Sequence, residues 1–327
     1  MTLLTIAIPT FNRSKLLDLC LQKIYEEIQM LDEYEHGLVK IYVSDNASSD
    51  DTSEIISSHL LKAEVEFDVI CNKENIGAER NLIQCYRSAQ TPYVWIFGDD
   101  DIIVPGGLRK VLHILQNTQV DIVYVNNHWF IGEYSWGKAK VEKNHFIEYQ
   151  SSLSFVRRTN IMLTFISAFI VRTGVNLELS ADLTGGSRLP QLGWLLPLLQ
   201  DGKNFVVIED VVVAAKGSNS GGYSLVEVFG YNLKNITENI FKDSPELSKT
   251  IQNGTIVNFF PGFIIKARKG MNRFADKNME AGLREVFGDN WRYYLFIYPL
   301  FRLPVSALNA YSKLMGIGRR LFYELLV

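Results

Sequence analysis

The chain has 327 residues, which is long enough for one large α/β domain with an appendage or for two modest domains. Apolar residues make up 47% and charged residues 21%, the composition of a globular protein rather than a disordered one. The formal net charge of −3 lacks the basic excess of a general nucleic-acid-binding protein, so we expect no nucleic-acid partner.

The sequence shows no targeting or membrane-spanning segment. The first 13 residues, MTLLTIAIPTFNR, have no basic stretch before the apolar run, which argues against a secretory signal. No stretch reaches the ~20 apolar residues that span a bilayer. Three cysteines, each within an apolar segment, favour buried thiols in a reducing compartment over disulfides or a zinc site. We therefore expect a cytoplasmic protein.

In the first 125 residues, strand patterns alternate with helical ones. The first is the continuous apolar run at 3–8, which is typical of a strand buried on both faces. This alternation predicts a mostly parallel sheet. The expected strands cover 3–8, 39–43, 65–71, 93–97 and 122–125, and the expected helices cover 17–28, 55–60, 81–89 and 108–115.

Beyond residue 125 the pattern is less regular. From 226 onward the periodicity is helical, and we expect three or four helices that end in an amphipathic segment. We therefore divide the chain into an α/β domain at 1–222 and a helical region at 223–327. Between these, we expect strands at 141–149, 165–171 and 205–214, a helix at 189–199, and a loop at 216–222.

Polar clusters follow each of the first four expected strands. Ligands of parallel sheets bind at the carboxyl ends of the strands, so these clusters are expected to converge on one edge. Their convergence is stronger evidence for a binding site than any one loop. The clusters lie at 10–13, 44–48, 72–77 and 98–101.

The run Asp99-Asp100-Asp101 is the sharpest of these features. At an effective dielectric of ~20, two like charges ~4 Å apart repel by about 4 kcal/mol. A hard cation such as Mg²⁺ or Mn²⁺ relieves this repulsion, and Mg²⁺ typically takes one or two carboxylates plus substrate phosphates. The alternative is a solvated acidic turn before the helix begun by Pro105. Because the run ends a buried strand opposite Asp45, we favour the metal site.

Asp45 follows the second expected strand, where a carboxylate can accept hydrogen bonds from a base or a ribose. The alternative is a helix cap, but other cap candidates follow it and leave Asp45 for a ligand. These other candidates are Ser48, Asp50, Asp51 and Thr52.

Residues 75–81 open a helix. Gly77 permits close backbone approach and Arg80 can face a phosphate, although an ordinary loop-to-helix junction would look the same. Neither GxGxxG after the first strand nor GxxxxGK[ST] occurs, which disfavours dinucleotide oxidoreductases and P-loop NTPases.

Four segments resemble the motifs of family 2 glycosyltransferases, in the order of that family. They are IPTFNR at 8–13, VSDNASSD at 43–50, Asn75-Ile76-Gly77 with Asn81, and FGDDD at 97–101. The resemblance implies a GT-A fold, an α/β Rossmann-like, mostly parallel sheet with a C-terminal helical extension. It also implies a hexosyltransferase-type enzyme, with the nucleotide sugar bound by 1–125 and the acceptor by 126–222.

The resemblance further implies roles for individual residues. Asp101, the firmest ligand, and Asp99 would bind Mn²⁺ or Mg²⁺, and the metal would neutralise the diphosphate leaving group. The residues that would bind the nucleotide-sugar donor are Pro9, Thr10, Phe11, Asn12, Arg13, Asp45, Asn75, Gly77, Arg80, Asp99 and Asp100.

The second half departs from the family pattern at the general base. Many members carry a Glu-Asp pair at the start of a helix, but the matching segment 189–195 reads LPQLGWL and has no carboxylate. Asp182 is the nearest acid and our candidate base. The equal alternative is that Asp182 is an ordinary loop residue near Gly185-Gly186. The pair Glu209-Asp210 is expected on a strand. The stereochemical outcome therefore stays open.

Two features point to the acceptor. The segments SAFI at 167–170, LPQ at 189–191 and NSGG at 219–222 are similar to abequosyltransferase-like enzymes that build bacterial surface polysaccharides such as O-antigen. Aromatic and basic residues at 291–302 suit a membrane interface, where a lipid-linked saccharide acceptor would lie, although helices that pack on the sheet are an alternative. We expect peripheral contact at the inner face of the cell membrane.

Two other functions compete with this one. A sugar-nucleotide pyrophosphorylase would need a Gly-rich basic loop after the first strand, and residues 9–13 contain no glycine. A glycosyltransferase-like protein that only binds stays open because the Glu-Asp pair is missing, although the acidic run argues against it. The sequence indicates no oligomeric state.

Overall fold

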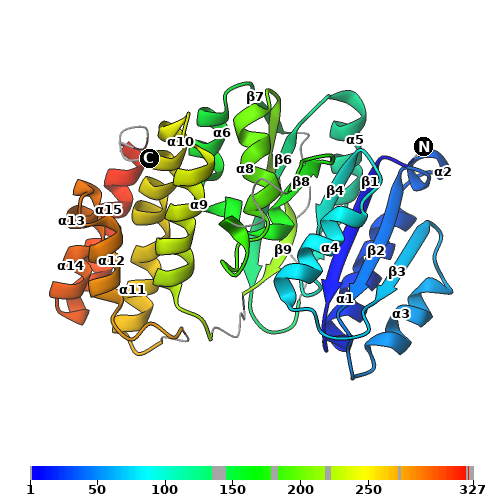
Figure 1. Cartoon of the computed structure of the whole chain (residues 1–327), viewed down its shortest axis with the longest axis horizontal. Coiled ribbons are helices and arrows are strands. Elements are labelled where there is room, and N and C mark those ends of the chain that lie inside the picture. The colour runs from blue at the N-terminus through cyan, green and yellow to red at the C-terminus, as the bar shows by residue number, and fades with distance from the viewer. Residues whose placement is uncertain are drawn as a thin grey trace. The chain divides into compact units, whose positions relative to one another are not determined.

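A computed structural model of the chain describes residues 2–134, 145–177, 183–217, 222–271, 274–321 and 323 (Figure 1). The chain forms two compact units. The first, which we call the sheet unit, comprises Met1–Ser151, Phe165–Leu177 and Pro197–Asn219. The second, the helical unit, comprises Ser152–Thr164, Glu178–Leu196 and Ser220–Val327. Packing therefore divides the chain discontinuously, and the functional division at residues 125 and 222 stays a prediction.

The sheet unit is built on one sheet, to which the described residues contribute nine strands in the order β3-β2-β1-β4-β8-β6-β9-β5, with β7 also paired to β9. β1 to β4, β6 and β9 run in one direction, and β5, β7 and β8 run against them, which confirms the predicted mostly parallel sheet. The strands are β1 (Leu4–Thr10), β2 (Val39–Asp45), β3 (Glu66–Cys71), β4 (Tyr93–Ile96), β5 (Ile102–Ile103), β6 (Ile122–Phe130), β7 (Phe146–Tyr149), β8 (Phe169–Arg172) and β9 (Phe205–Lys216).

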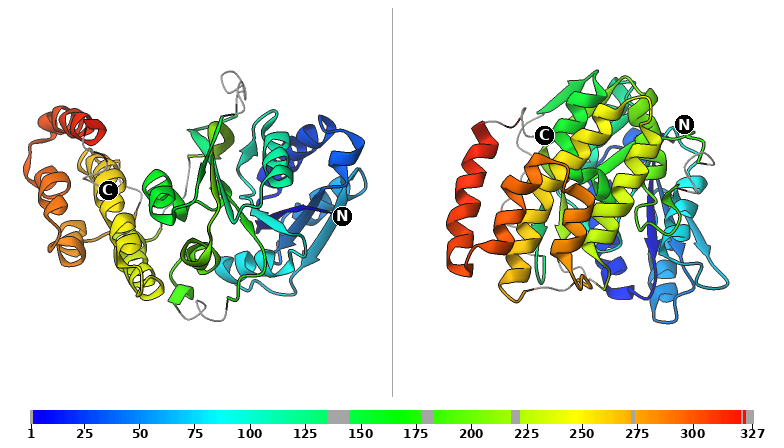
Figure 2. Two further views of the ribbon diagram at one scale, coloured as in Figure 1. Left: turned by 90° about the horizontal axis from the view of Figure 1, so that it is seen from above. Right: turned by 60° about the vertical axis from the view of Figure 1, so that its left-hand side comes forward.

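Helices cover both faces of this sheet, as expected for strands that are apolar on both sides. α1 and α5 bury their apolar stripes in the core on one face, while α4 lies over β1, β2 and β4 on the other (Figure 2). The helical segments of the sheet unit are α1 (Ser14–Gln29), α2 (Glu33–His36), α3 (Thr52–Leu60), α4 (Ala78–Ser88), α5 (Gly107–Asn117) and the 3-10 turn η2 (Ile166–Ala168). The helix α8 (Leu192–Asp201) is divided between the units, with Pro197–Asp201 in the sheet unit.

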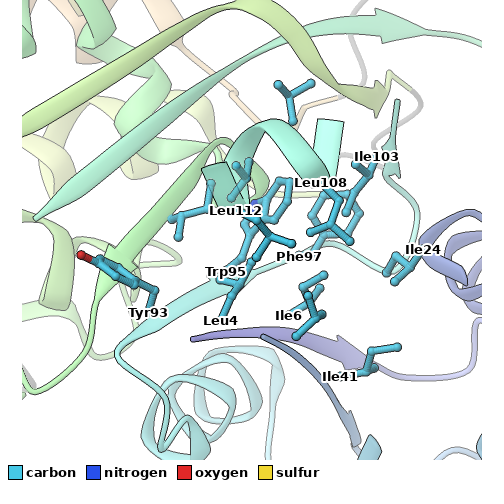
Figure 3. Packing of buried hydrophobic residues seen from close by; sticks show 14 of the residues in the cluster. Leu4, Ile6, Ile24, Ile41, Tyr93, Trp95, Phe97, Ile103, Leu108 and Leu112 are labelled. Carbon is cyan, nitrogen blue, oxygen red and sulfur yellow. The ribbon is translucent and has the colours of Figure 1, made fainter. Parts of the chain in front are cut away.

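The core of the sheet unit packs around the ends of β1 and β4 (Figure 3). Ile6, Trp95 and Phe97 are fully buried, and the rings of Trp95 and Phe97 meet edge to face with centroids 5.1 Å apart. Leu108 and Leu112 of α5 close the cluster from above the sheet. Burying side chains of this size contributes about 1.5–3 kcal/mol each, so the strand that leads into Asp99 is held firmly.

A buried carboxylate joins α1 to α5. Glu27 of α1 is 2% exposed and accepts hydrogen bonds from the backbone N–H groups of Gly106 and Leu108, each at 3.0 Å. A negative charge there complements the dipole of α5 at its N-terminus. Burial nevertheless raises the pKa of Glu27 from 4.5 to about 7, because its hydrogen bonds only partly replace water.

The helical unit is formed by helices that pack around a second apolar core. The expected C-terminal helical extension is confirmed, but the described residues after 226 contain more helical segments than the three or four predicted. Short π-helical turns continue neighbouring helices, and Pro299 and Pro304 start new ones. The segments are α6 (Ser152–Thr159), η1 (Asn160–Thr164), η3 (Val226–Asn232), α9 (Leu233–Ile240), α10 (Pro245–Gly254), η4 (Thr255–Phe259), α11 (Phe260–Arg268), α12 (Met279–Phe287), α13 (Trp291–Phe296), α14 (Tyr298–Arg302) and α15 (Val305–Leu321).

Some local predictions were wrong. The strand expected at 165–171 begins only at Phe169, after the 3-10 turn η2. Cys71 is exposed, whereas the other two cysteines are buried, because β3 is an edge strand whose last two residues lie outside the core. Glu209 and Asp210 lie on a strand as expected, and they form a bulge in β9 where its pairing with β6 shifts register.

Parts of other predictions fall outside the described residues. Of the strand expected at 141–149, the structure describes 145–149 and places β7 at Phe146–Tyr149. Most of the loop expected at 216–222 lies outside the described residues. Within the described ranges, no helix is both long and apolar enough to cross a bilayer.

We expect the stability of the fold to fall as the pH rises from 4.5 to about 7, through the titration of Glu27. In this window the folded state keeps a proton that the unfolded state has released, so raising the pH favours unfolding by up to about 1.4 kcal/mol per pH unit. Glu27→Gln removes this contribution. Urea unfolding at several pH values measures the slope.

Glu33→Gln is the matched control, since Glu33 is an exposed glutamate of α2 in the same unit. It should leave the pH slope of the wild type unchanged. An unaltered slope in Glu27→Gln would contradict the assignment.

Candidate functional site

The loops that follow β1 and β2 are bonded to each other. The Asn46 N–H donates to the Thr10 carbonyl at 3.0 Å, and the Asn12 N–H donates to Ser48 Oγ at 2.8 Å. In return the Ser49 N–H donates to Asn12 Oδ1 at 2.7 Å. Asn12 has φ +52°, a left-handed conformation that asparagine tolerates better than most residues. Two of the four predicted loops are thus brought together.

The loop after β4 joins them through Asp99. This carboxylate is 4% exposed and accepts from Thr10 Oγ1 at 2.8 Å and from Arg13 Nη1 at 2.8 Å. The same Arg13 nitrogen lies 3.2 Å from Asp100 Oδ2. Burial raises the pKa of Asp99, and the guanidinium of Arg13 opposes that rise. Arg13 therefore partly neutralises the acidic run.

Asp101 is held by donors from two other elements, the strand β9 and the turn η2. It is 4% exposed, and its Oδ1 accepts from the Lys216 backbone N–H of β9 at 3.0 Å. Its Oδ2 accepts from Ser167 Oγ of η2 at 2.6 Å, and Ser167 Oγ in turn accepts from the Gly98 N–H at 2.9 Å. Burial raises the pKa of Asp101 to about 7, and the hydrogen bond from Ser167 works against it.

The sequence analysis did not identify Ser167 as a site residue. Its only signal was its place in the SAFI segment, which says nothing about Asp101. Gly98 belongs to the same arrangement, because a Cβ there would lie 3.0 Å from Asp101 Oδ2 and 3.3 Å from Ser167 Oγ. A larger residue at 98 would push the carboxylate and the hydroxyl apart.

These carboxylates fit a cation that takes few protein ligands. Each of the four oxygens of Asp99 and Asp101 accepts one hydrogen bond, and carboxylate oxygens have a second lone-pair direction. Among the described residues, no group of three or more His, Cys, Asp or Glu side chains is arranged to enclose a metal. The chemistry therefore suits Mg²⁺ or Mn²⁺ completed by phosphate oxygens and water, rather than a closed protein site.

Asp45 is less available than the sequence suggested. It is 4% exposed, and its Oδ1 accepts from the Ser48 N–H at 3.1 Å and from Ser48 Oγ at 2.5 Å. One oxygen of Asp45 thus stabilises its own loop. Of the residues expected as helix caps, Asp50 accepts a hydrogen bond at 3.0 Å from the N–H of Ser14, which is the first residue of α1.

Asn46 connects this loop to the one after β3. Its Oδ1 accepts from the Ile76 N–H at 3.0 Å, and its Nδ2 donates to Asn75 Oδ1 at 2.9 Å. Asn75 Oδ1 also accepts from the Gly77 N–H at 2.8 Å. Gly77 has φ +89°, which side-chain-bearing residues rarely adopt, and it precedes α4 directly. All four predicted loops are therefore linked by hydrogen bonds at one sheet edge.

The other predicted site residues lie around this edge with varied exposure. Pro9 is half-buried in β1 beside Ser44 of β2, whereas Phe11 is 39% exposed in the loop beyond. Arg80 is exposed on the first turn of α4. Their contacts with a donor stay predictions.

The candidate base cannot be placed, because Asp182 lies outside the described residues. Asp210, of the pair Glu209-Asp210, lies on β9 and accepts a hydrogen bond from the buried Lys110 of α5. That ion pair makes Asp210 unsuitable as a base.

The LPQ segment at 189–191 leads into α8, which begins at Leu192. Gln191 Nε2 donates to the Thr164 carbonyl at 2.8 Å.

Comparison with known proteins gives a family and a fold. Residues 5–177 match the family described as Glycosyl transferase family 2. Abequosyltransferase RfbV of Salmonella typhimurium is 33% identical over 123 residues, which are 37% of this chain and 34% of that protein. The chain thus aligns with about a third of the length of this curated relative.

Solved structures share the fold over nearly the whole chain. Residues 1–349 of S. aureus TarS superpose with a TM-score of 0.61 at 14% identity, covering 99% of this chain and 92% of that one. The mannosyltransferase PcManGT of Pyrobaculum calidifontis, solved with GDP-Man and Mn²⁺, gives 0.54 at 14% identity, covering 98% and 87%. At these identities the likeness is one of fold, and it agrees with the expected GT-A-like architecture.

The family match runs from β1 through β8 and contains the loops that gather around Asp99 and Asp101. It spans more than half of the 327 residues. The chain therefore belongs to glycosyl transferase family 2 and is a glycosyltransferase.

Proposed function

We propose that this enzyme transfers a sugar from a nucleoside-diphosphate donor to a lipid-linked saccharide during bacterial surface polysaccharide synthesis, with Mn²⁺ or Mg²⁺ at Asp101 and Asp99. The observation that carries the proposal is the pair of buried, hydrogen-bonded carboxylates at the edge where the four loops meet. The partial identity with an abequosyltransferase, and neighbours solved with UDP-GlcNAc or with GDP-Man and Mn²⁺, support it.

In this proposal the loops after β1 and β2 hold the nucleoside. Ser48 occupies one oxygen of Asp45, which leaves the other oxygen to accept from a ribose or base. Phe11 follows Thr10, which pairs with Asp45, and its exposed ring offers an apolar surface to the base. We assign the phosphates to the N-terminus of α4, which follows Gly77, and to Arg80, since the helix end and the guanidinium both carry positive charge.

Arg13 links the acidic run to the donor. Its guanidinium lies between Asp99 and Asp100 and its side chain is 45% exposed. When a diphosphate enters, the guanidinium can keep its bond to Asp99 and exchange Asp100 for a phosphate oxygen. Arg13 therefore limits repulsion before the donor binds and orients the donor afterwards.

Asp101 and Asp99 would hold the cation, and Ser167 and the Lys216 amide would orient Asp101. When bound, the cation neutralises negative charge that develops on the diphosphate leaving group. Asp182 is the proposed base that takes the proton from the acceptor hydroxyl.

Membrane contact is proposed through the C-terminal helices. Trp291 and Tyr294 are 50% and 51% exposed on α13. Arg292 lies over the Trp291 ring at 4.6 Å, and Arg302 over the Tyr298 ring at 4.9 Å. Exposed aromatic rings paired with guanidinium groups suit the headgroup region of a bilayer at the cytoplasmic face, where a lipid-linked acceptor is reached.

One alternative keeps support. A glycosyltransferase-like protein that binds donor without transferring the sugar fits the absence of a carboxylate in segment 189–195. Family membership disfavours the pyrophosphorylase alternative.

We expect one of UDP, GDP, CDP and dTDP to bind only when Mn²⁺ or Mg²⁺ is present. Asp101→Asn should weaken that binding by at least about tenfold, because it removes the charge that holds the cation. Isothermal titration calorimetry with and without metal measures both effects. Asp289→Asn, which changes an exposed acid of the helical unit, is the control. The metal site would be contradicted if every nucleotide bound equally well without metal, or if none of the four nucleotides bound.

Ser167→Ala should shift the metal-dependent nucleotide binding to higher pH. The hydroxyl stabilises the ionised form of Asp101, so its loss raises the pKa of that carboxylate further. We also expect affinity at neutral pH to fall by about 10- to 100-fold. Calorimetry across the pH range, with Ser167→Thr as the variant that retains a hydroxyl, measures the shift. Weaker binding with an unshifted pH profile would indicate a purely structural role.

Asp182→Asn should lower turnover by about 10²-fold or more while leaving the dissociation constant of the donor unchanged, as expected for a general base. Release of nucleoside diphosphate from the donor in the presence of membrane acceptor gives the rate. Asp201→Asn, at the end of α8, is the control. Full turnover in Asp182→Asn would place the base elsewhere, and no turnover in the wild type would favour the binding-only alternative.

A further inference from the structure

A cavity of about 740 Å³ opens in the helical unit between α15 and the turn η4. Three cations line it, and none of its described lining residues is acidic. The cations are Lys313, Arg319 and Arg320, and they are accompanied by Asn258, Ile317 and Tyr323. A cavity of this volume is within the range that takes a small organic ligand.

The cations are presented by one helix. Lys313, Ile317 and Arg320 are spaced by four and three residues, which places them on one face of α15. Lys313 and Arg320 are exposed, whereas Arg319 is half-buried and donates from Nη1 to the Val257 carbonyl at 3.1 Å. Burial lowers the pKa of Arg319. The cavity thus combines one anchored guanidinium with two cations that can move toward a ligand.

The described residues of α15 include no acidic residue that could compensate these charges, and the next acid in the sequence is Glu324, which lies outside the described residues. The segment 303–323 contains Lys313, Arg319 and Arg320 and neither Asp nor Glu. A cavity lined by cations attracts an anion, and a planar guanidinium matches the oxygens of a phosphate group.

The same helix also exposes apolar side chains. Leu314, Ile317 and Leu321 are 59%, 57% and 70% exposed, and their spacing of three and four residues makes one stripe. Of the described residues of α15, only Leu308 is buried. An apolar stripe of this kind beside a cationic cavity indicates a ligand that carries both a phosphate and hydrocarbon.

We propose that this cavity binds the headgroup of an anionic phospholipid. The phosphate lies among Lys313, Arg319 and Arg320, and α15 lies in the bilayer interface with Leu314 and Leu321 toward the acyl chains. The proposal rests on the membrane contact in the proposed function and names the lipid that provides it. A headgroup site would hold the enzyme at the bilayer surface independently of donor and acceptor.

The test uses the full chain and vesicles of phosphatidylcholine doped either with phosphatidylglycerol or with oleate to the same surface potential. Lys313→Gln/Arg320→Gln should reduce the partition coefficient on phosphatidylglycerol vesicles by about tenfold or more, since each cation near an anionic surface contributes substantially. The control, Lys242→Gln/Lys249→Gln, removes the same charge from exposed positions of the same unit and should change binding little.

Oleate vesicles present charge without phosphate. The wild type should bind them more weakly than it binds phosphatidylglycerol vesicles, and Lys313→Gln/Arg320→Gln should bind them almost as well as the wild type does. Equal loss in both double variants, or equal wild-type binding to both vesicle types, would overturn the proposal in favour of diffuse electrostatic attraction. Retention only on vesicles that contain a polyprenyl diphosphate would also overturn it, because the cavity would then serve the acceptor.

Nucleotide binding in solution, measured on the same samples, separates this proposal from the proposed function. The cavity variant should keep wild-type nucleotide affinity. If the wild type bound no nucleotide, the proposed function would fail, while the phosphatidylglycerol result would still decide the lipid site.

Discussion

The burial of two carboxylates, Asp99 and Asp101, is the constraint on which the sheet unit depends. An ionised carboxylate inside a protein is costly unless hydrogen bonds or a cation replace its water. Here the donors come from separate parts of the chain: Thr10 at the end of β1, Arg13 before α1, Ser167 in η2 and the Lys216 amide at the end of β9. Only a sheet that brings β1, β4 and β9 to the right places satisfies both groups.

The apolar core and the polar edge are parts of one arrangement. Trp95 packs against Phe97 in the core and donates from Nε1 to the Ser167 carbonyl at 2.8 Å. The same Ser167 binds the Gly98 amide and Asp101 with its hydroxyl. Packing on β4 therefore sets the position of the acidic run directly, and the site gains preorganisation from burial rather than from loop contacts alone.

The helical unit presents a different chemistry. Its described surface combines exposed rings on α13 and α14 with the cations and apolar stripe of α15, whereas the sheet edge concentrates carboxylates and amides. A transferase that takes a water-soluble donor and a lipid-linked acceptor needs both kinds of surface. The proposed function uses both, and the headgroup site adds the cations and apolar stripe of α15 to the membrane-facing surface.

By itself, the sequence determined the alternation of strands and helices, the mostly parallel sheet and the four loops at its edge. These follow from local periodicity and from the rule that carboxyl ends of parallel strands share an edge. Only the tertiary structure decided that Ser167 and the Lys216 amide hold Asp101, and that Glu27 caps α5. These contacts join residues 66, 115 and about 80 positions apart, and strand order, not local pattern, brings such residues together. The exposure of Cys71 has the same origin, because an apolar run does not reveal that its strand lies at an edge.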